Sequence, residues 1–287
     1  MKIVVTGGTG QLGTDVVKEL KKRGHDVIGL GSADMDITDA DSVSSVIGSL
    51  KPDAVIHCAA WTAVDAAEDA ENREKVFAVN SAGTENIAKV CRRLGCKMLY
   101  ISTDYVFSGA GEQPWEPDCK DFSPLNVYGE SKLRGELAVI ENLEKYFIVR
   151  IAWVFGLHGK NFVKTMLNVA KSHDTVRVVN DQIGTPTYTP DLAVLLADMI
   201  VTESYGFYHA TNEGGYISWY DFTREIYRLA GLATKVIPVS TAEYGLSKAR
   251  RPYNSRLDRS KLVSSGFSPL PPWQDALARF IEEYEKS

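Results

Sequence analysis

Near its start the sequence reads Ile3-Val4-Val5-Thr6-Gly7-Gly8-Thr9-Gly10-Gln11-Leu12-Gly13, and this stretch decides the fold. Its first four residues are apolar or β-branched, a pattern typical of a strand that is buried on both faces. A helical pattern follows the glycines as far as Arg23, and residues 26–30 have the composition of another strand. Strand, glycine-rich turn, helix and strand in this order predict an α/β fold with a doubly wound parallel sheet.

The turn between the first strand and the helix also predicts a ligand. Glycine lets the backbone approach a pyrophosphate closely, and a helix N-terminus offers free N–H groups and the positive end of the helix dipole. We therefore expect a dinucleotide to bind at this turn, as in Rossmann-type folds. The residues predicted to contact it are Gly7, Gly10, Gln11, Leu12 and Gly13. The alternative is a tight turn that serves packing only.

The residues after the second strand bear on the choice between NADH and NADPH. An acidic residue at this position binds the ribose 2′-hydroxyl, whereas a basic residue accommodates a 2′-phosphate. Here the chain reads Leu30-Gly31-Ser32-Ala33-Asp34, with neither type directly at the strand end. We predict weak discrimination, with catalytic efficiencies for the two cofactors within roughly a hundredfold of each other.

Composition limits the other possibilities. With 287 residues, the chain is long enough for one large domain and a smaller lobe. Its net charge of −5 does not favour nucleic acid as a partner, and its apolar runs are too short to span a membrane. The four cysteines form no CxxC pair and the five histidines show no ligand spacing. We expect a cytoplasmic protein that has no metal site.

A second candidate site combines Tyr128 and Lys132, which are four residues apart near the predicted start of a helix. Residues with this spacing share a helix face. A free phenol has a pKa of about 10, and a cation held close to it lowers that value. The pair is therefore suited to exchange a proton with a carbonyl or an alcohol oxygen. The alternative is an ordinary pair of surface side chains.

Together, the glycine turn and Tyr128-x-x-x-Lys132 resemble the short-chain dehydrogenase/reductase superfamily, in particular its extended members. The resemblance implies that Thr103 completes the catalytic set by hydrogen bonding the substrate carbonyl oxygen, and that Asn80 braces the lysine. The residues expected near the cofactor are Asp36 and Ile37 at the adenine, then Ala59, Ala60, Trp61, Thr62 and Ile101, together with Tyr128 and Lys132. Alternatively, Thr103 only ends a strand, and Thr38 or Asp39 caps a helix.

Longer segments resemble the dTDP-4-dehydrorhamnose reductase family. They are Ser102-Thr103-Asp104-Tyr105-Val106-Phe107, then residues 124–132, 150–156, 180–187 and 251–257. The resemblance runs from Met1 to about Trp273, with departures at Trp61 and Ile151-Ala152. It implies reduction of the C4 ketone of dTDP-4-dehydro-L-rhamnose by NADPH or NADH. Tyr128 would donate the proton, and Asp104 and Trp153 would contact the sugar.

The second half of the chain predicts a smaller substrate-binding lobe. We assign residues 1–155 to the cofactor-binding domain, with returns near 187–203, and residues 156–287 mainly to the lobe. Between Ser247 and Lys261 six positive charges face one negative charge, at Asp258. Arginines suit a diphosphate because their forked donors match its oxygens, so we assign Arg251 to the nucleotide sugar. The alternative is a solvated, salt-bridged surface.

Two other functions stay open at this point. One is a nucleotide-sugar 4,6-dehydratase or 4-epimerase, although Tyr105 stands where dehydratases of the superfamily carry a glutamate. The other is a non-catalytic, cofactor-binding regulatory subunit, which would tolerate loss of Tyr128 or Lys132. The sequence is compatible with either a monomer or a homodimer.

Overall fold

The computed structural model describes residues 1–286, and within them six parallel strands form one sheet. The strands are β1 (Lys2–Thr6), β2 (Asp26–Leu30), β3 (Ala54–His57), β4 (Lys97–Thr103), β5 (Tyr146–Ile151) and β10 (Gly206–His209). Their order is β10-β5-β4-β3-β1-β2. The direction of winding reverses between β1 and β3, and in open parallel sheets such a reversal opens a crevice at the carboxyl ends of the strands.

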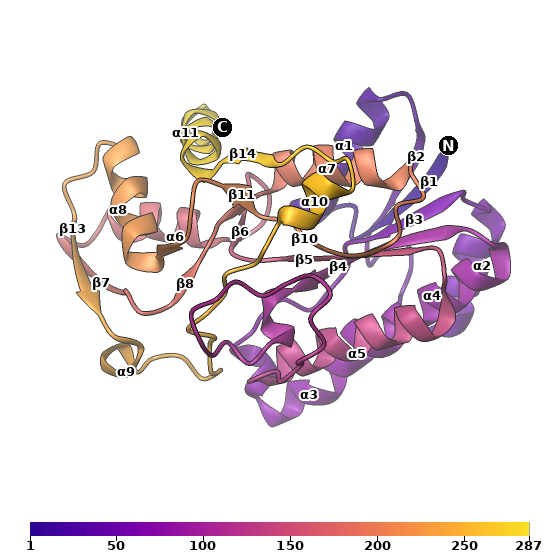
Figure 1. Cartoon of the computed structure of the whole chain (residues 1–287), viewed down its shortest axis with the longest axis horizontal. Helices are drawn as coiled ribbons and strands as arrows, with labels where there is room; N and C mark the ends of the chain where they lie inside the picture. Colours follow the sequence, from indigo (N-terminus) through magenta and orange to yellow (C-terminus); the bar gives the residue numbers. More distant parts are fainter. Residues whose placement is uncertain (287) are drawn as a thin grey trace.

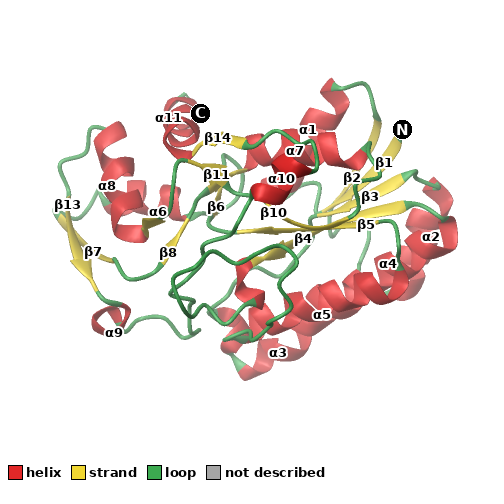
Figure 2. Ribbon diagram, in the orientation of Figure 1, coloured by secondary structure: helices red, strands yellow, loops and turns green. Residues whose placement is uncertain are grey.

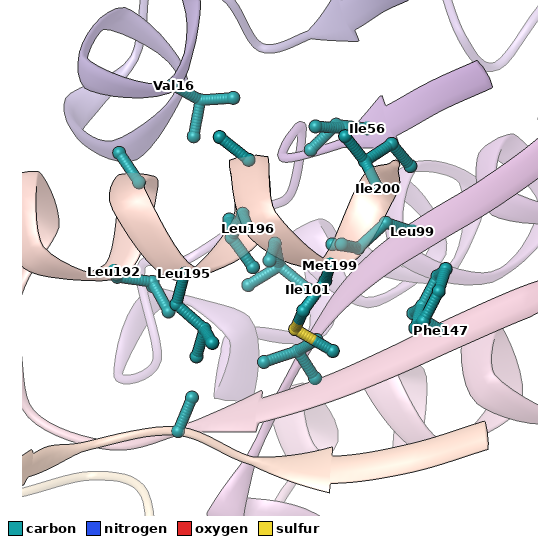
Figure 3. Packing of buried hydrophobic residues seen from close by; sticks show 14 of the residues in the cluster. Val16, Ile56, Leu99, Ile101, Phe147, Leu192, Leu195, Leu196, Met199 and Ile200 are labelled. Atoms are coloured by element: carbon teal, nitrogen blue, oxygen red, sulfur yellow. The ribbon is translucent and has the colours of Figure 1, made fainter. Parts of the chain in front are cut away.

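Helices cover both faces of this sheet (Figure 1). One face carries α1 (Gln11–Lys22) and α7 (Thr189–Ile200), and the other carries α2 (Ala40–Leu50), α4 (Gly83–Leu94) and α5 (Val127–Asn142). Figure 2 shows the same layers by type of element, and Figure 3 shows the apolar side of α7 packed on the strands. There, Leu196 and Met199 share one buried cluster with Leu99 and Phe147. This apolar contact closes one face of the sheet.

A second body of structure follows the sheet (Figure 1). Its helices are α6 (Phe162–Val169), α8 (Trp219–Leu229), α9 (Thr241–Tyr244) and α11 (Trp273–Glu285), whereas α10 (Ser260–Ser264) lies beside β10 and packs its Leu262 into the cluster of α7 and the sheet. Its short strands are β6 (Val154–Phe155), β7 (Thr175–Val179), β8 (Ile183–Gly184), β9 (Thr187–Tyr188), β11 (Asn212–Glu213), β12 (Ile217–Ser218), β13 (Lys235–Val239) and β14 (Leu270–Pro272). They pair two by two, and an aromatic cluster fills the space between α6, α8 and α11.

The predicted fold class is confirmed, with differences in two helices. The sequence pattern predicts a helix over residues 133–142, but α5 begins six residues earlier, at Val127, because Asn126 caps it by accepting the Gly129 N–H at 2.8 Å. The apolar pattern predicts one helix over about residues 73–94, whereas the structure has α3 (Ala70–Phe77), a π-helical turn (Ala78–Ala82) and α4 there. No helix within residues 1–286 is both long enough and apolar enough to cross a membrane.

Candidate active site

A cavity of about 1010 Å³ lies at the carboxyl end of the sheet, between the sheet and the second body of structure. One wall consists of the N-terminus of α1, the end of β4 and the first turns of α5. The other wall consists of parts of β7, α8, α9 and a segment that follows α9, residues 245–251, which we call the strap. The cavity therefore joins the predicted cofactor side to the predicted substrate side.

The glycine turn fits a pyrophosphate. Gly7 has a φ of +66°, and a Cβ on it would lie 2.7 Å from the Ala59 nitrogen, while a Cβ on Gly13 would lie 2.1 Å from the Gly7 oxygen. These two glycines therefore pack the turn against the sheet and the helix. Gly10 is the N-cap of α1, and no side chain caps the helix. Because Gly10, Gln11 and Leu12 line the cavity, the free N–H groups of α1 are placed for an anion.

The other residues predicted to bind the cofactor fall into two groups. Ala60, Thr62 and Ile101 line the cavity, as do Tyr128 and Lys132. Those outside its lining, among the described residues, are Gly7, Gly13, Asp36, Ile37, Ala59 and Trp61. The residues of this second group do not line the cavity, so their role at the cofactor stays a prediction.

Local hydrogen bonds explain where Asp36 and its neighbours lie. One oxygen of Asp36 accepts from the N–H and the hydroxyl of Thr38 at 2.9 and 2.8 Å, and Asp39 is the N-cap of α2. Asp34 adds a feature that its position in the sequence did not predict. Its carboxylate accepts the Gly31 N–H at 2.8 Å and so returns to the end of β2.

The three predicted catalytic residues converge on this cavity. Thr103 is the last residue of β4, and Tyr128 and Lys132 lie on successive turns of α5. The start of that helix is held from two sides, because Asn126 donates to the Arg250 carbonyl oxygen and Glu68 accepts the Val127 N–H, each at 2.8 Å. The helix therefore enters the site with a fixed register relative to the strap.

Burial decides the protonation of these groups. It raises the pKa of Tyr128 well above its ordinary value, and the neighbouring Thr103 hydroxyl only partly opposes this. The net shift of the pKa of this phenol is therefore opposite to the lowering that was expected, because burial dominates it. Burial also lowers the pKa of Lys132 to about 7, and its ammonium donates to the Ile101 carbonyl oxygen at 2.7 Å. Tyr128 is therefore a protonated phenol at neutral pH, and Lys132 titrates there.

Asp104 is a buried carboxylic acid beside Thr103. Burial raises its pKa to about 6, opposed by the hydroxyls of Ser255 and Thr103. Thr103 donates to Oδ1 at 3.0 Å, while Oδ2 has no hydrogen-bond partner. A buried oxygen without a good partner is costly, so its position at the cavity indicates a functional role.

Aromatic residues form a further part of the cavity wall. Trp153 has a φ of +51°, which is unusual for a residue other than glycine, and its ring stacks on that of Trp219 with centroids 3.7 Å apart. Both rings line the cavity. Sequence reasoning missed Trp219, because it begins a helix in a segment for which only packing was expected. Strained backbone that presents an aromatic ring at a cavity is typical of a ligand site.

The basic segment serves mostly to anchor the chain. Arg251 forms a two-pronged ion pair with Asp65 at 2.8 and 3.1 Å, and Lys248 pairs with Asp69 at 2.8 Å. Lys248, Arg250 and Arg251 line the cavity. By contrast, Arg259 and Lys261 bind Glu213 and Asp118 outside that lining. Of the predicted cluster, only the three cations of the strap line the cavity, and the salt-bridged alternative describes Arg259 and Lys261.

Asn80, which was expected to brace Lys132, forms its hydrogen bonds with Trp61 and Ser131 instead. The Asn80 amide accepts the Trp61 N–H at 2.8 Å and donates to the Trp61 carbonyl oxygen and the Ser131 hydroxyl. Ser131 in turn donates to the Tyr128 carbonyl oxygen at 2.7 Å. Asn80 therefore ties the loop after β3 to the first turns of α5. Within residues 1–286, no cluster of three or more His, Cys, Asp or Glu is placed to hold a metal.

Comparison with known proteins agrees with this site. A family model described as the RmlD substrate binding domain matches residues 1–286. The chain belongs to this family. Among curated relatives, dTDP-4-dehydrorhamnose reductase of Streptomyces griseus is 41% identical over 96% of this chain and 91% of its own length. Spore coat polysaccharide biosynthesis protein SpsK of Bacillus subtilis is 39% identical over 98% and 97%.

Solved structures agree over the full length. A dTDP-4-dehydrorhamnose reductase of Bacillus anthracis, in complex with NADP, has a TM-score of 0.93 at 40% identity and covers 99% of this chain and 100% of its own. An ortholog from Clostridium acetobutylicum has a TM-score of 0.95 at 40% identity, with the same coverage. The predicted resemblance to this reductase family is confirmed.

Proposed function

We propose that this protein reduces the C4 ketone of dTDP-4-dehydro-L-rhamnose to give dTDP-L-rhamnose, with NADPH or NADH as the reductant. One observation carries the proposal. Thr103, Tyr128 and Lys132 line the same cavity as the uncapped N-terminus of α1 on one side and the cations of the strap on the other. A dinucleotide and a nucleotide sugar therefore each have a matching surface, and the catalytic side chains stand between them.

The proton is assigned to Tyr128. A bound reduced nicotinamide supplies hydride chemistry in this cavity. The raised pKa of Tyr128 keeps the phenol protonated at neutral pH, so it is ready to donate to an oxygen that gains negative charge. The Thr103 hydroxyl stands beside Tyr128 and would provide a second donor to that oxygen by turning its proton away from Asp104. The Lys132 ammonium, one turn along α5, stabilises the phenolate that remains.

This assignment predicts how activity depends on pH. The pKa of Lys132 is lowered to about 7, so its charged fraction falls as the pH rises through 7. Because the ammonium is the useful form, kcat/KM of the free enzyme should decline on the alkaline side of pH 7. Asp104, whose pKa is raised to about 6, should produce the acid limb if its carboxylate contacts the sugar.

The substrate is assigned to the wall formed by the strap. Arg251 and its neighbours Lys248 and Arg250 would bind the diphosphate, while Trp153 offers a ring face to the sugar. Arg251 must then exchange part of its pairing with Asp65 for phosphate oxygens, at an ion pair that is only partly buried. Such an exchange costs little, because surface ion pairs contribute about 0–1 kcal/mol.

The test is a cofactor balance with purified protein. NADPH and NADH are supplied in parallel with dTDP-4-dehydro-L-rhamnose, and with dTDP-4-keto-6-deoxy-D-glucose as the competing sugar. The second sugar is chosen because a relative from Streptomyces niveus, 36% identical, is described as a dTDP-4-keto-6-deoxy-D-glucose reductase. Stoichiometric oxidation with the first sugar supports the proposal. Turnover without net oxidation of the cofactor indicates an epimerase. A higher catalytic efficiency with the second sugar would mean that dTDP-4-keto-6-deoxy-D-glucose, rather than dTDP-4-dehydro-L-rhamnose, is the substrate.

The same assay measures the choice of cofactor. We expect the two catalytic efficiencies to lie within about a hundredfold of each other. The Asp34 carboxylate at the end of β2 disfavours a 2′-phosphate by charge repulsion, so Asp34→Ala should move the ratio toward NADPH. A ratio that does not respond to this substitution would remove Asp34 from the cofactor site.

Three further assignments complete the proposal. Residues 1–155, with a return near 187–203, form the cofactor-binding domain, and residues 156–286 form mainly the substrate-binding lobe, while the last residue of the predicted range lies outside the described residues. The protein acts in the cytoplasm. It acts as a monomer or a homodimer, which the molar mass in solution would determine.

A further inference from the structure

Tyr100 lies directly beneath the lysine of the candidate site. It belongs to β4, and its side chain is fully buried. The Lys132 ammonium nitrogen stands 4.1 Å from the centre of the Tyr100 ring, and the Tyr100 hydroxyl donates to the Lys132 carbonyl oxygen at 3.3 Å. One aromatic side chain therefore contacts both the charged end and the backbone of Lys132.

The fit between Tyr100 and α5 is close enough to require a glycine. A Cβ on Gly135 would lie 2.3 Å from the Tyr100 hydroxyl and 2.5 Å from the Asn80 carbonyl oxygen. Gly135 therefore lets the helix rest directly on Tyr100 and on the π-helical turn. Because a π-turn inside a helix often marks a functional site, this docking is consistent with a positioning role.

The titratable groups near Lys132 offer its ammonium no free negative charge, so the Tyr100 ring contributes much of its stabilisation. Glu136 on α5 raises the pKa of Lys132, but its carboxylate is held by Arg150 through bonds of 2.8 and 2.7 Å. Cys58, a half-buried residue of the cavity wall, has a thiol whose pKa is raised to about 12 by desolvation, so it is uncharged. His57, stacked on Tyr100, has its pKa lowered to about 3 by burial and is neutral as well.

The hydroxyl of Tyr100 also stays neutral, because burial raises its pKa far above the ordinary value. The interaction with Lys132 is therefore that of a cation over an aromatic face. Such contacts are strongest when the cation has lost its water, and Lys132 is 2% exposed. The direct partners of the ammonium, among the described contacts, are this ring and the Ile101 carbonyl oxygen.

We propose that Tyr100 is a positioning residue whose ring holds Lys132 in its charged form and in its place below Tyr128. The inference rests on the proposed function, since it assigns a task to Lys132 in that reaction. It predicts that removing the ring makes the ammonium easier to deprotonate. Removing only the hydroxyl leaves the ring face, and the charge on the lysine, largely as they are.

The test follows the ionisation of Lys132 by ¹³C NMR of lysine labelled at Cε, with Lys132→Met to assign the signal. In Tyr100→Leu, the midpoint for Lys132 should move about 0.5–1.5 pH units toward acid. In Tyr100→Phe, it should move by less than about 0.3 unit. A shift of the alkaline limb of kcat/KM by the same amount should accompany the change in Tyr100→Leu.

A matched control is Tyr208 in β10, another buried tyrosine of the same sheet. Its ring also faces a lysine, Lys261, at 5.4 Å, and its hydroxyl donates to the Ser204 carbonyl oxygen. Tyr208→Leu should lower stability without moving the midpoint of Lys132. If Tyr100→Leu does not fold, Tyr100→Phe is compared with pentafluorophenylalanine at position 100, which keeps the shape of the ring but reverses its face charge.

The outcomes separate this inference from the proposed function. The inference is overturned if the titration midpoint of Lys132 does not move in Tyr100→Leu, even if the enzyme reduces the nucleotide sugar. The same holds for the pentafluorophenylalanine protein where that protein is used in place of Tyr100→Leu. An equal shift in Tyr208→Leu also overturns it, because the effect would then be a general loss of packing. A shifted midpoint in a protein that reduces no nucleotide sugar supports the contact between the two residues but rejects the proposed function.

Discussion

The wall of the cavity formed by β4 and α5 is buried, whereas the wall formed by the strap is largely exposed. Lys132 and Asp104 are 2% and 3% exposed, but Leu246 of the strap is 78% exposed. The first wall is held by backbone hydrogen bonds, helix caps and close packing at glycines. The second is held to the sheet side by ion pairs such as Arg251–Asp65 and Lys248–Asp69.

This difference separates two tasks. Buried groups have perturbed pKa values, as Tyr128, Lys132 and Asp104 do, and proton transfer needs such values. Exposed ion pairs are weak and exchange partners readily, which suits a surface that must admit and release a charged substrate. Proton transfer therefore belongs to the buried wall and binding of the nucleotide sugar to the exposed one. Substitutions in the buried wall should change the rate and its pH dependence, whereas substitutions in the exposed wall should change KM.

The largest effect on stability is expected in the buried wall, from Asp104→Asn. The pKa of Asp104 is raised to about 6, so the native state holds a proton there that the unfolded chain has released. The free energy of unfolding of the wild type therefore falls as the pH rises from about 4 to 6, and asparagine, which does not ionise, removes this fall. The difference in free energy of unfolding between Asp104→Asn and the wild type should therefore be about 2 kcal/mol more favourable to the variant at pH 7.5 than at pH 4.5.

Urea unfolding at the two pH values measures this difference. Ser255→Ala is a control, because it removes a hydroxyl beside the carboxylate without removing the charge. It should not abolish the pH dependence. A gain for Asp104→Asn that is the same at both pH values would mean that Asp104 carries no buried charge. The variant should also lose activity, if the carboxylate contacts the sugar.

The next effect is expected in the exposed wall, from Arg251→Ala. Hydrogen bonds to charged groups contribute about 1.5–3 kcal/mol, so KM for the nucleotide sugar should rise about 10- to 100-fold. The Kd for the reduced cofactor and kcat should change little, because Arg251 lies on the strap rather than at α1. Steady-state kinetics and cofactor titration measure the two effects. If both ligands weaken equally, Arg251 does not bind the diphosphate.

The smallest effect is expected from Lys248→Ala, which serves as the matched control for Arg251. Lys248 also belongs to the strap and pairs with an aspartate, but its side chain is 64% exposed. An exposed ion pair contributes about 0–1 kcal/mol, so KM should change less than about fivefold. A change as large as that of Arg251→Ala would show that the strap acts through its total charge rather than through one guanidinium.

Much of the buried wall could be predicted from the sequence. The glycine turn, the strand ending at Thr103 and the pair Tyr128 and Lys132 depend on short-range patterns, which the order of the elements then brings together. The same patterns do not show how deeply a side chain is buried. The sequence argument therefore predicts a lowered pKa for Tyr128, whereas burial raises it. The early start of α5 was missed because Gly129 and Ser131 are poor helix formers.

The exposed wall could be predicted less well. Its ion pairs join residues far apart in sequence, such as Asp65 and Arg251, and no local pattern indicates them. The same holds for Trp219, which reaches Trp153 only through the folding of the second body of structure. The return of Asp34 to Gly31 depends on the conformation of one turn. Sequence therefore predicts the groups that do chemistry better than the groups that select the substrate.

The most direct test of the division between the two walls is a single-turnover measurement with Tyr128→Phe. Enzyme in excess, loaded with reduced cofactor, is mixed with dTDP-4-dehydro-L-rhamnose, and cofactor oxidation is followed at saturating substrate. We expect a rate at least about 100-fold below that of the wild type, with unchanged Kd values for both ligands. A rate close to that of the wild type would contradict it, because the buried wall would then not supply the proton.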